Sequence, residues 1–296
     1  DSPWGKGRPG WHIECSAMVK DELGETIDIH LGGSDLIFPH HENEIAQSES
    51  ANNKKLANYW LHNGMVNVNG QKMSKSLKNF TTIRDLLDSG TSPMTLRYFV
   101  LTVNYRKPLD FTDEALKSAS EAWKNINVAL SFFDITKKEN LSIEVNEMNE
   151  FIEEKYKDMI NDEISQKKIK FTNALNNDLN TAGAIAIIYE LAKPLKNFIN
   201  QFQRIKKLEI NTNEKFHLRE TFKTLEELTD VLGLKKEEII IENRINEDQI
   251  LSLINKRLIA KKEKDYAEAD KIRNSLKEKG VELIDQSPEL TTWVRI

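Results

Sequence analysis

Gly32-Gly33-Ser34-Asp35-Leu36-Ile37-Phe38-Pro39-His40-His41-Glu42-Asn43-Glu44 follows a short β-branched run, Ile27-Asp28-Ile29-His30. A strand that leads into two glycines lets the backbone come close to a ligand at the carboxyl edge of a parallel sheet. Pro39 suits the first turn of a helix, because the N–H group that proline lacks is unpaired there anyway. If a helix begins at Pro39, His40 and Glu44 project from one face. The stretch therefore predicts the strand, turn and helix of an α/β fold.

An imidazole and a carboxylate placed in this way can bind one zinc ion together. The only cysteine, Cys15, lies upstream in Trp11-His12-Ile13-Glu14-Cys15-Ser16 and can supply a thiolate to the same ion. Cys15, His40 and Glu44 would leave at least one coordination position open. An open position is what a working metal needs, since the substrate must reach it.

Each of these residues also has an ordinary structural explanation. A lone cysteine is usually a small buried hydrophobic residue, and His with Glu at helical spacing usually forms a solvated face. The segment His41-Glu42-Asn43-Glu44-Ile45 is close to the HExxH pattern of zinc proteases, but Ile45 stands where the second histidine is required. The spacing alone therefore excludes that protease class and leaves the metal site open.

A second landmark is Lys72-Met73-Ser74-Lys75-Ser76, which follows the turn Asn67–Gln71. Two lysines around small hydroxyl residues predict a mobile cationic loop, suited to a triphosphate whose negative charge grows as phosphate departs. The chain has no GxxxxGK[ST], so this is not a Walker-type loop. An exposed basic turn without function is the alternative.

Three segments in this order and spacing resemble cysteinyl-tRNA synthetase, a class I aminoacyl-tRNA synthetase. They are Gly10–Cys15, Phe38–Gln47 and the KMSKS segment Lys72–Ser76. The resemblance covers essentially the whole chain. It implies an α/β fold: the C-terminal portion of a class I Rossmann-like catalytic domain, then an α-helical bundle and a small α/β C-terminal domain.

The resemblance also implies roles for individual residues. Cys15, His40 and Glu44, with a cysteine from a preceding half, would bind one Zn²⁺ per chain that takes the substrate thiol as a thiolate. L-Cysteine, ATP (with Mg²⁺) and tRNA(Cys) would be the substrates. The remaining residues would bind ATP (Gly32, Gly33, Asp35, Lys75), stabilise phosphate charge during catalysis (Lys72, Lys75) and wall the amino-acid pocket (Trp11, His12).

Members of this family begin with a nucleotide-binding half that carries an HxGH signature. None of the six histidines here heads such a pattern, and the chain does not begin with methionine. We therefore expect the chain to start in mid-protein. Taken alone, it should bind RNA but not activate an amino acid.

Length and composition limit the number of domains, the cellular compartment and the possibility of a membrane span. The chain has 296 residues, a formal net charge of −5 and one cysteine. Its length allows two or three cores, and one cysteine excludes an internal disulfide and fits a reducing compartment, which for this family is the cytoplasm. No hydrophobic run is long enough for a membrane span, and no segment indicates an obligate interface. We expect a cytoplasmic monomer.

Local patterns divide the chain into three segments, 1–108, 109–242 and 243–296. The resemblance implies that these are, in order, the C-terminal half of the catalytic domain with its stem-contact region, a helical bundle and an anticodon-binding domain. Within them the sequence predicts a strand over Met65–Val68, helices over Thr82–Leu87 and Pro93–Leu101, and a helix over Ile45–Leu61.

The last domain is locally basic. Between Asn255 and Lys279 there are nine Lys or Arg residues and five Asp or Glu residues, although the whole chain is acidic. A local cationic patch can hold a phosphate backbone because screening makes nearby charges dominate; a solvated amphipathic helix is the alternative. The family resemblance implies four tRNA-facing residues: Lys261, Asp270, Asp285 and Trp293, with Lys261 where an arginine is usual.

Two other functions fit parts of this evidence. A related ligase joins cysteine to an amino sugar with the same pocket, although such an enzyme would have no anticodon for a basic C-terminal domain to read. The other is a non-catalytic tRNA-binding fragment, which would bind tRNA without catalysing pyrophosphate exchange.

Overall fold

The computed structural model describes residues 1–74, 76–138, 152–204, 210–238, 247–287 and 290–295. Its contacts form two compact units. The first contains 1–120 and the short segment 177–182, and the second contains 121–176 and 183–296. The predicted division into three domains stays a prediction.

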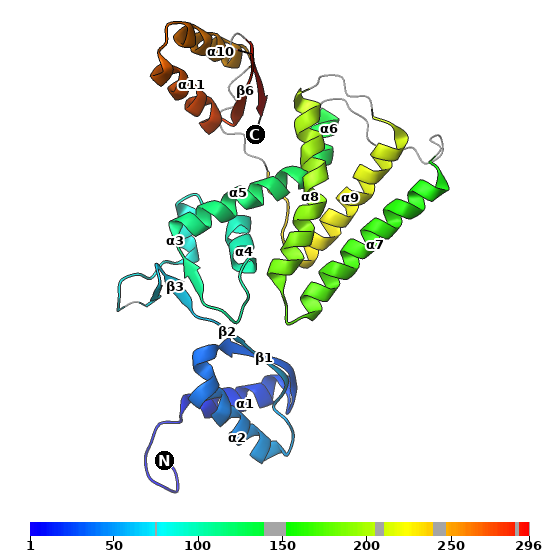
Figure 1. The fold of residues 1–296 in the computed structure, drawn as a ribbon. Coiled ribbons are helices and arrows are strands. Elements are labelled where there is room, and N and C mark those ends of the chain that lie inside the picture. The colour runs from blue at the N-terminus through cyan, green and yellow to red at the C-terminus, as the bar shows by residue number, and fades with distance from the viewer. Residues whose placement is uncertain (75, 139–151, 205–209, 239–246, 288–289, 296) are drawn as a thin grey trace. The chain divides into compact units, whose positions relative to one another are not determined.

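The first unit opens with helix α1 (Trp11–Leu23) and a strand–helix–strand motif, β1 (Ile27–Gly33), α2 (Glu42–Asn52) and β2 (Ala57–Asn63) (Figure 1). Strands β1 and β2 are parallel, with Ile27 opposite Ala57 and Gly33 opposite Asn63. Parallel neighbours joined through a helix are the unit of α/β folds. The predicted strand before Gly32 is confirmed.

The prediction of a single helix over Ile45–Leu61 is wrong. Helix α2 ends at Asn52, and Asn53 adopts a left-handed conformation (φ 55°) that caps it. Asparagine tolerates this conformation, which stops a helix. The following aromatic segment, with Tyr59 and Trp60, then extends as β2, the state that such side chains favour.

Pro39 begins a helical turn, as the sequence predicts, although the turn is irregular. Phe38 is extended (φ −130°, ψ 134°), and the residues around it form a wide turn, η2 (Ile37–His41), that runs directly into α2. A short 3₁₀ turn, η1 (Ser34–Leu36), connects it to β1. The i,i+4 relation between His40 and Glu44 therefore holds, and their side chains meet.

A second small sheet follows, in the order β4 (Gln71–Lys72), β3 (Val66–Val68), β5 (Leu109–Phe111). Strand β3 is antiparallel to β4 and parallel to β5. The predicted helices here are confirmed as α3 (Ile83–Asp88) and α4 (Pro93–Leu101). Thr82 caps α3 in a reciprocal capping box with Asp85, and Ser92 caps α4 ahead of Pro93, as their side chains favour.

Long helices make up the next region: α5 (Asp113–Leu130), α6 (Phe132–Lys138), α7 (Glu154–Asn176), α8 (Thr181–Arg204) and α9 (Thr212–Val231). Apolar residues at helical spacing on α8 are buried, among them Ile188, Leu191, Leu195 and Ile199. Phe132 and Phe222 pack in the same core. These buried apolar side chains form the core between the helices.

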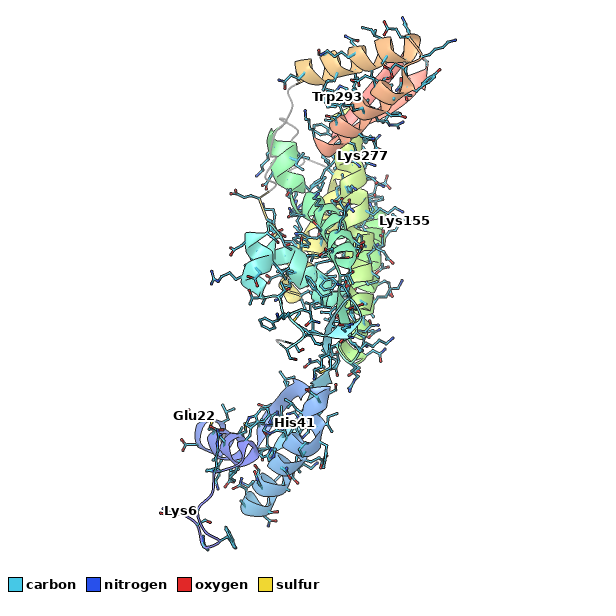
Figure 2. The ribbon with its side chains drawn as sticks, turned by 90° about the vertical axis from the view of Figure 1, so that its left-hand side faces the viewer. Lys6, Glu22, His41, Lys155, Lys277 and Trp293 are labelled. Carbon is cyan, nitrogen blue, oxygen red and sulfur yellow. The ribbon has the colours of Figure 1, made fainter. Side chains whose placement is uncertain are left out.

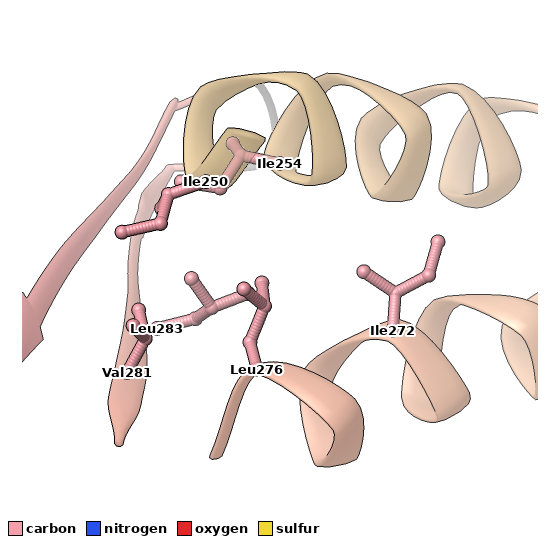
Figure 3. Close-up of a cluster of buried hydrophobic side chains, with 6 residues drawn as sticks. All are labelled: Ile250, Ile254, Ile272, Leu276, Val281 and Leu283. Atoms are coloured by element: carbon pink, nitrogen blue, oxygen red, sulfur yellow. The ribbon is translucent and has the colours of Figure 1, made fainter. Parts of the chain in front are cut away.

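The chain closes with α10 (Glu247–Lys262), α11 (Tyr266–Glu278) and an antiparallel hairpin, β6 (Val281–Ser287) and β7 (Leu290–Arg295). Figure 3 shows the cluster of buried apolar side chains between them: Ile250, Ile254, Ile272, Leu276, Val281 and Leu283. Both helices and the hairpin contribute to this core, so the segment has a hydrophobic centre of its own. Within the described residues, no helix combines the length and apolar character that a bilayer crossing needs.

Candidate metal centre

Cys15, His40 and Glu44 come from three different elements, α1, η2 and α2. The structure brings them together: one ligand atom from each lies within 4.8 Å of the other two. Bond lengths to zinc of about 2.0–2.3 Å place neighbouring ligands of a tetrahedral ion roughly 3.3–3.8 Å apart. The predicted triad is therefore spatially competent to hold one ion after small side-chain adjustments.

Glu44 is the centre of the cluster, and only 1% of it is exposed. Its Oε2 atom lies 2.6 Å from His30 Nε2, and its Oε1 atom lies 2.6 Å from His40 Nε2. Despite that distance, Oε1 receives no well-formed hydrogen bond from any described residue. A buried carboxylate oxygen without a donor is costly, and a cation between Glu44 and His40 would satisfy it.

The orientation of His40 is fixed by its neighbours. Its Nδ1 atom is 2.7 Å from Nδ1 of His12, so one of the two nitrogens donates a proton to the other. The Trp11 ring packs on the His40 ring at a centroid distance of 4.0 Å. Histidine ligands in metal sites usually have their second ring nitrogen hydrogen-bonded in this way. The structure thus places Trp11 and His12 beside the cluster, where the sequence predicts the pocket wall.

Burial raises the pKa of the Cys15 thiol, and the charge of the nearby Glu44 carboxylate raises it further. Without a metal the sulfur is therefore a neutral thiol at pH 7. A thiolate is the form that binds a metal, so coordination would release a proton. Thiolate, imidazole and carboxylate are a donor set that zinc accepts, and the three residues fit that ion.

A second potential triad shares Glu44 and adds His30 and His41. His41 Nδ1 is 2.8 Å from His62 Nε2, and the His30 ring stacks on Trp60 at 4.5 Å. Figure 2 labels His41 within this N-terminal region. Burial is the first cause that lowers the pKa of both His41 and His62, and the charge of His30 adds to it. Both rings are therefore neutral at pH 7 and can accept or donate hydrogen bonds.

The sequence prediction did not include His30, His41, His62 and Trp60 in the site. Five of the six histidines lie before residue 63, and that concentration was a usable signal. What the sequence hides is the register, in which His30 lies opposite Trp60 and Gly32 opposite His62. Because alternate residues share a face, this pairing collects the rings on one side of β1 and β2.

The two glycines at the end of β1 lie in close contact with other side chains. A Cβ atom on Gly32 would lie 2.5 Å from Cε1 of His41, and one on Gly33 would lie 2.5 Å from Oδ1 of Asp35. At Gly32 a side chain would collide with the buried His41 ring, whereas at Gly33 the exposed Asp35 side chain could move aside. The Asp35 Oδ2 atom lies 3.8 Å from Nζ of Lys72, so the two predicted nucleotide-binding positions face each other.

Asn79 supports the lysine loop. It accepts a hydrogen bond from the Ser74 amide and donates one to the Lys72 carbonyl, so it ties the residues after the loop to the start of the loop. Lys75 lies outside the described residues, so its predicted contact with phosphate stays a prediction.

The four predicted RNA-facing residues belong to one small region. Lys261 is on α10, Asp270 is exposed on α11, and Asp285 and Trp293 are on β6 and β7. Trp293 is partly buried and packs against the apolar cluster of Figure 3, so only part of its ring can stack on a base. Lys261 Nζ lies 3.1 Å from Asp285 Oδ1.

The sequence also matches two known protein families. Residues 1–121 match the family described as "tRNA synthetases class I (C) catalytic domain", and residues 170–236 match the "DALR domain". A solved methionyl-tRNA synthetase from Mycobacterium tuberculosis, bound by methionyl-adenylate, aligns with 69% of this chain and 41% of its own at a TM-score of 0.50 and 18% identity. At that identity the likeness concerns the fold alone, and it confirms the predicted class I architecture.

Two curated relatives match the chain over all 296 residues. The cysteine–tRNA ligase of Prochlorococcus marinus subsp. pastoris is 97% identical, and that of P. marinus strain MIT 9515 is 93% identical. The chain spans 60% of the length of each relative. The predicted resemblance is confirmed: the chain is similar along its whole length to curated cysteine–tRNA ligases, and its first 121 residues match the class I synthetase catalytic domain.

Proposed function

We propose that the protein containing this chain ligates L-cysteine to tRNA(Cys) in the cytoplasm, through a cysteinyl adenylate made from ATP. The observation that carries the proposal is the meeting of Cys15, His40 and Glu44 around a carboxylate oxygen that receives no hydrogen bond from the described residues. Cysteine and serine differ by one atom, and a hydrophobic pocket alone separates such close analogues by only about 10- to 200-fold. A metal ion that binds sulfur more tightly than oxygen would increase the discrimination between cysteine and serine.

A zinc ion held by these three residues supplies a Lewis acid that prefers sulfur to oxygen and lowers the pKa of a thiol. The other residues bind and orient. His30 holds one oxygen of Glu44, His12 fixes the ring of His40, and Trp11 covers that ring. These contacts hold the donor atoms in place before the substrate arrives, which reduces the reorganisation needed on binding.

ATP would occupy the turn after β1. Gly32 and Gly33 allow the backbone to approach the nucleotide, and the Asp35 carboxylate can accept hydrogen bonds from ribose hydroxyls. Lys72, 3.8 Å from Asp35, and Lys75 would stabilise the growing charge on the phosphates, together with Mg²⁺. A ribose hydroxyl at the 3′ end of tRNA would then lose its proton and attack the acyl carbon, which breaks the anhydride bond of the adenylate and releases AMP.

The direct test uses a protein that joins this chain to the N-terminal part of its 97% identical relative. Cysteine-dependent exchange of pyrophosphate into ATP should be observed, and serine should support far less exchange. Lys75→Ala should slow exchange strongly and leave tRNA binding nearly unchanged. Equal losses in the two assays would contradict the role of Lys75.

The acceptor distinguishes this proposal from an amino-sugar ligase. Added tRNA(Cys) should consume the adenylate, whereas an amino sugar should not. The basic segment between Asn255 and Lys279 supports the tRNA acceptor. Consumption by the sugar alone would overturn the proposal, and tRNA binding without any exchange would identify a non-catalytic RNA-binding protein.

A further inference from the structure

A buried arginine lies directly beneath the basic surface of the C-terminal segment. Arg257 is only 2% exposed, and it stands one helical turn before Lys261 on α10. Both side chains reach Asp285 on β6. The cluster therefore contains two cations and one anion at the junction between α10 and the hairpin.

Asp285 has little capacity left for another donor. Its Oδ1 atom accepts from Arg257 Nη1 at 2.8 Å and from the Thr291 hydroxyl at 2.7 Å, and it lies 3.1 Å from Lys261 Nζ. Its Oδ2 atom accepts from Arg257 Nη2 at 3.0 Å. A carboxylate that is bound in this forked manner is a strong partner for arginine. It is poorly placed to read a base by accepting further hydrogen bonds.

The charges of this cluster sum to one positive charge, and only one of the cations is near solvent. The side chain of Lys261 is 25% exposed, whereas that of Arg257 is 3% exposed. If Arg257 were neutral, Lys261 and Asp285 would form a pair with no net charge. The buried guanidinium thus decides whether Lys261 presents a charge to a polyanion.

We propose that Arg257 is a positioning residue for RNA binding, which neutralises Asp285 so that Lys261 offers its positive charge to the RNA backbone or a base acceptor. This inference rests on the proposed tRNA-binding function. In this proposal Asp285 orients Lys261 and Arg257 and does not itself contact the RNA. Arg257 itself does not touch the RNA.

The test measures how the affinity of the 296-residue chain for an RNA hairpin carrying the anticodon loop of tRNA(Cys) depends on salt. Each cation that engages a nucleic acid contributes about 0.7 to 0.9 to the slope of log K against log salt. Arg257→Gln should lower the slope by about that amount and weaken binding on the order of three- to tenfold. Lys261→Gln should have the same effect.

The decisive variant is Arg257→Gln with Asp285→Asn. It replaces the buried ion pair by two amides of similar size, and a buried pair can often be replaced by neutral groups without loss of stability. Because Lys261 then has no anion beside it, slope and affinity should return to those of the original chain. Lys155→Gln, on α7 (Figure 2), is the matched control for loss of one positive charge and should leave the slope unchanged.

Hydrogen exchange of α10 and β6 in each variant shows whether the segment remains folded. A double variant that is folded and still binds as weakly as Arg257→Gln would overturn the inference, because Asp285 would then contact RNA directly. A folded Arg257→Gln variant with an unchanged slope would also overturn it. If the original chain does not bind the hairpin at all, the proposed function fails instead.

Discussion

Glu44 and Arg257 are both buried charges, but the structure treats them differently. Arg257 has a full countercharge, since both oxygens of Asp285 accept from its guanidinium. Glu44 is enclosed by imidazoles and a thiol, and one of its oxygens lacks a well-formed hydrogen bond from any described residue. A buried charge that is already compensated serves orientation, whereas one surrounded by metal-ligating groups is prepared for a cation.

The largest effect should come from removing the countercharge at the compensated site. Arg257→Met leaves Asp285 with the Lys261 ammonium and the Thr291 hydroxyl, and we expect a loss of about 3 kcal/mol in the unfolding free energy of the C-terminal segment. This value is at the low end for a broken buried pair because Asp285 is one-third exposed and water screens it. Hydrogen exchange of α10 and α11 measures the change. Arg257→Met with Asp285→Leu should recover most of it, and a double variant as unstable as the single one would contradict the assignment.

The second largest effect should come from adding a cation at the Glu44 site, where it should increase the free energy of unfolding. Zinc at a free concentration about one hundred times its Kd should stabilise the region that contains α1 and α2 by about 2.7 kcal/mol. Hydrogen exchange of these helices with zinc and with a chelator measures the difference. Glu44→Gln should abolish it, and the control Glu14→Gln, an exposed acid on α1, should not. Equal stabilisation of both variants would place the ion elsewhere.

Acid should affect the two sites differently. Arg257, then Thr291 and Lys261, hold the pKa of Asp285 well below its usual range. For a carboxyl with a depressed pKa, the extra stability is fully present above the unfolded pKa, roughly 3.9, and is lost as the pH falls from there toward the folded value. Urea midpoints of the C-terminal segment should therefore fall progressively as the pH is lowered below about 4. Asp285→Asn should flatten that dependence, and an equally steep decline in the variant would contradict it.

An exposed ion pair provides the smallest effect. Arg106 bonds both carboxylate oxygens of Asp178, and together with Tyr105 it lowers the pKa of Asp178 to about 2. Both side chains are about half exposed, so solvent screens the pair. Asp178→Asn should destabilise the first unit much less than Arg257→Met destabilises the C-terminal segment. Thermal unfolding of the two variants side by side tests this, and a larger loss for Asp178→Asn would reverse the ranking.

The sequence predicted the part of the metal site that depends on local spacing. His40 and Glu44 share one face by helix geometry, and the structure brings their side chains together. The position of Cys15 came from the family resemblance, because no local rule places α1 against α2. The false helix through Asn53 arose because composition does not distinguish a helical asparagine from a left-handed cap.

The contacts that the sequence could not give are set by strand register. His30 meets Trp60, and Asp285 comes within reach of Arg257, only after a strand has paired with a particular partner. A one-residue shift would turn every side chain to the other face. Spacing along the chain therefore could not predict that His30 and Trp60 join the first site or that Asp285 joins the second.

X-ray absorption at the zinc edge of the metal-loaded chain tests the central claim most directly. One sulfur neighbour should appear at about 2.3 Å, together with nitrogen and oxygen neighbours at about 2.0–2.2 Å. The sulfur contribution should disappear in Cys15→Ser. A zinc ion without sulfur in the original chain, or a spectrum unchanged by Cys15→Ser, would contradict the claim that Cys15, His40 and Glu44 share one ion.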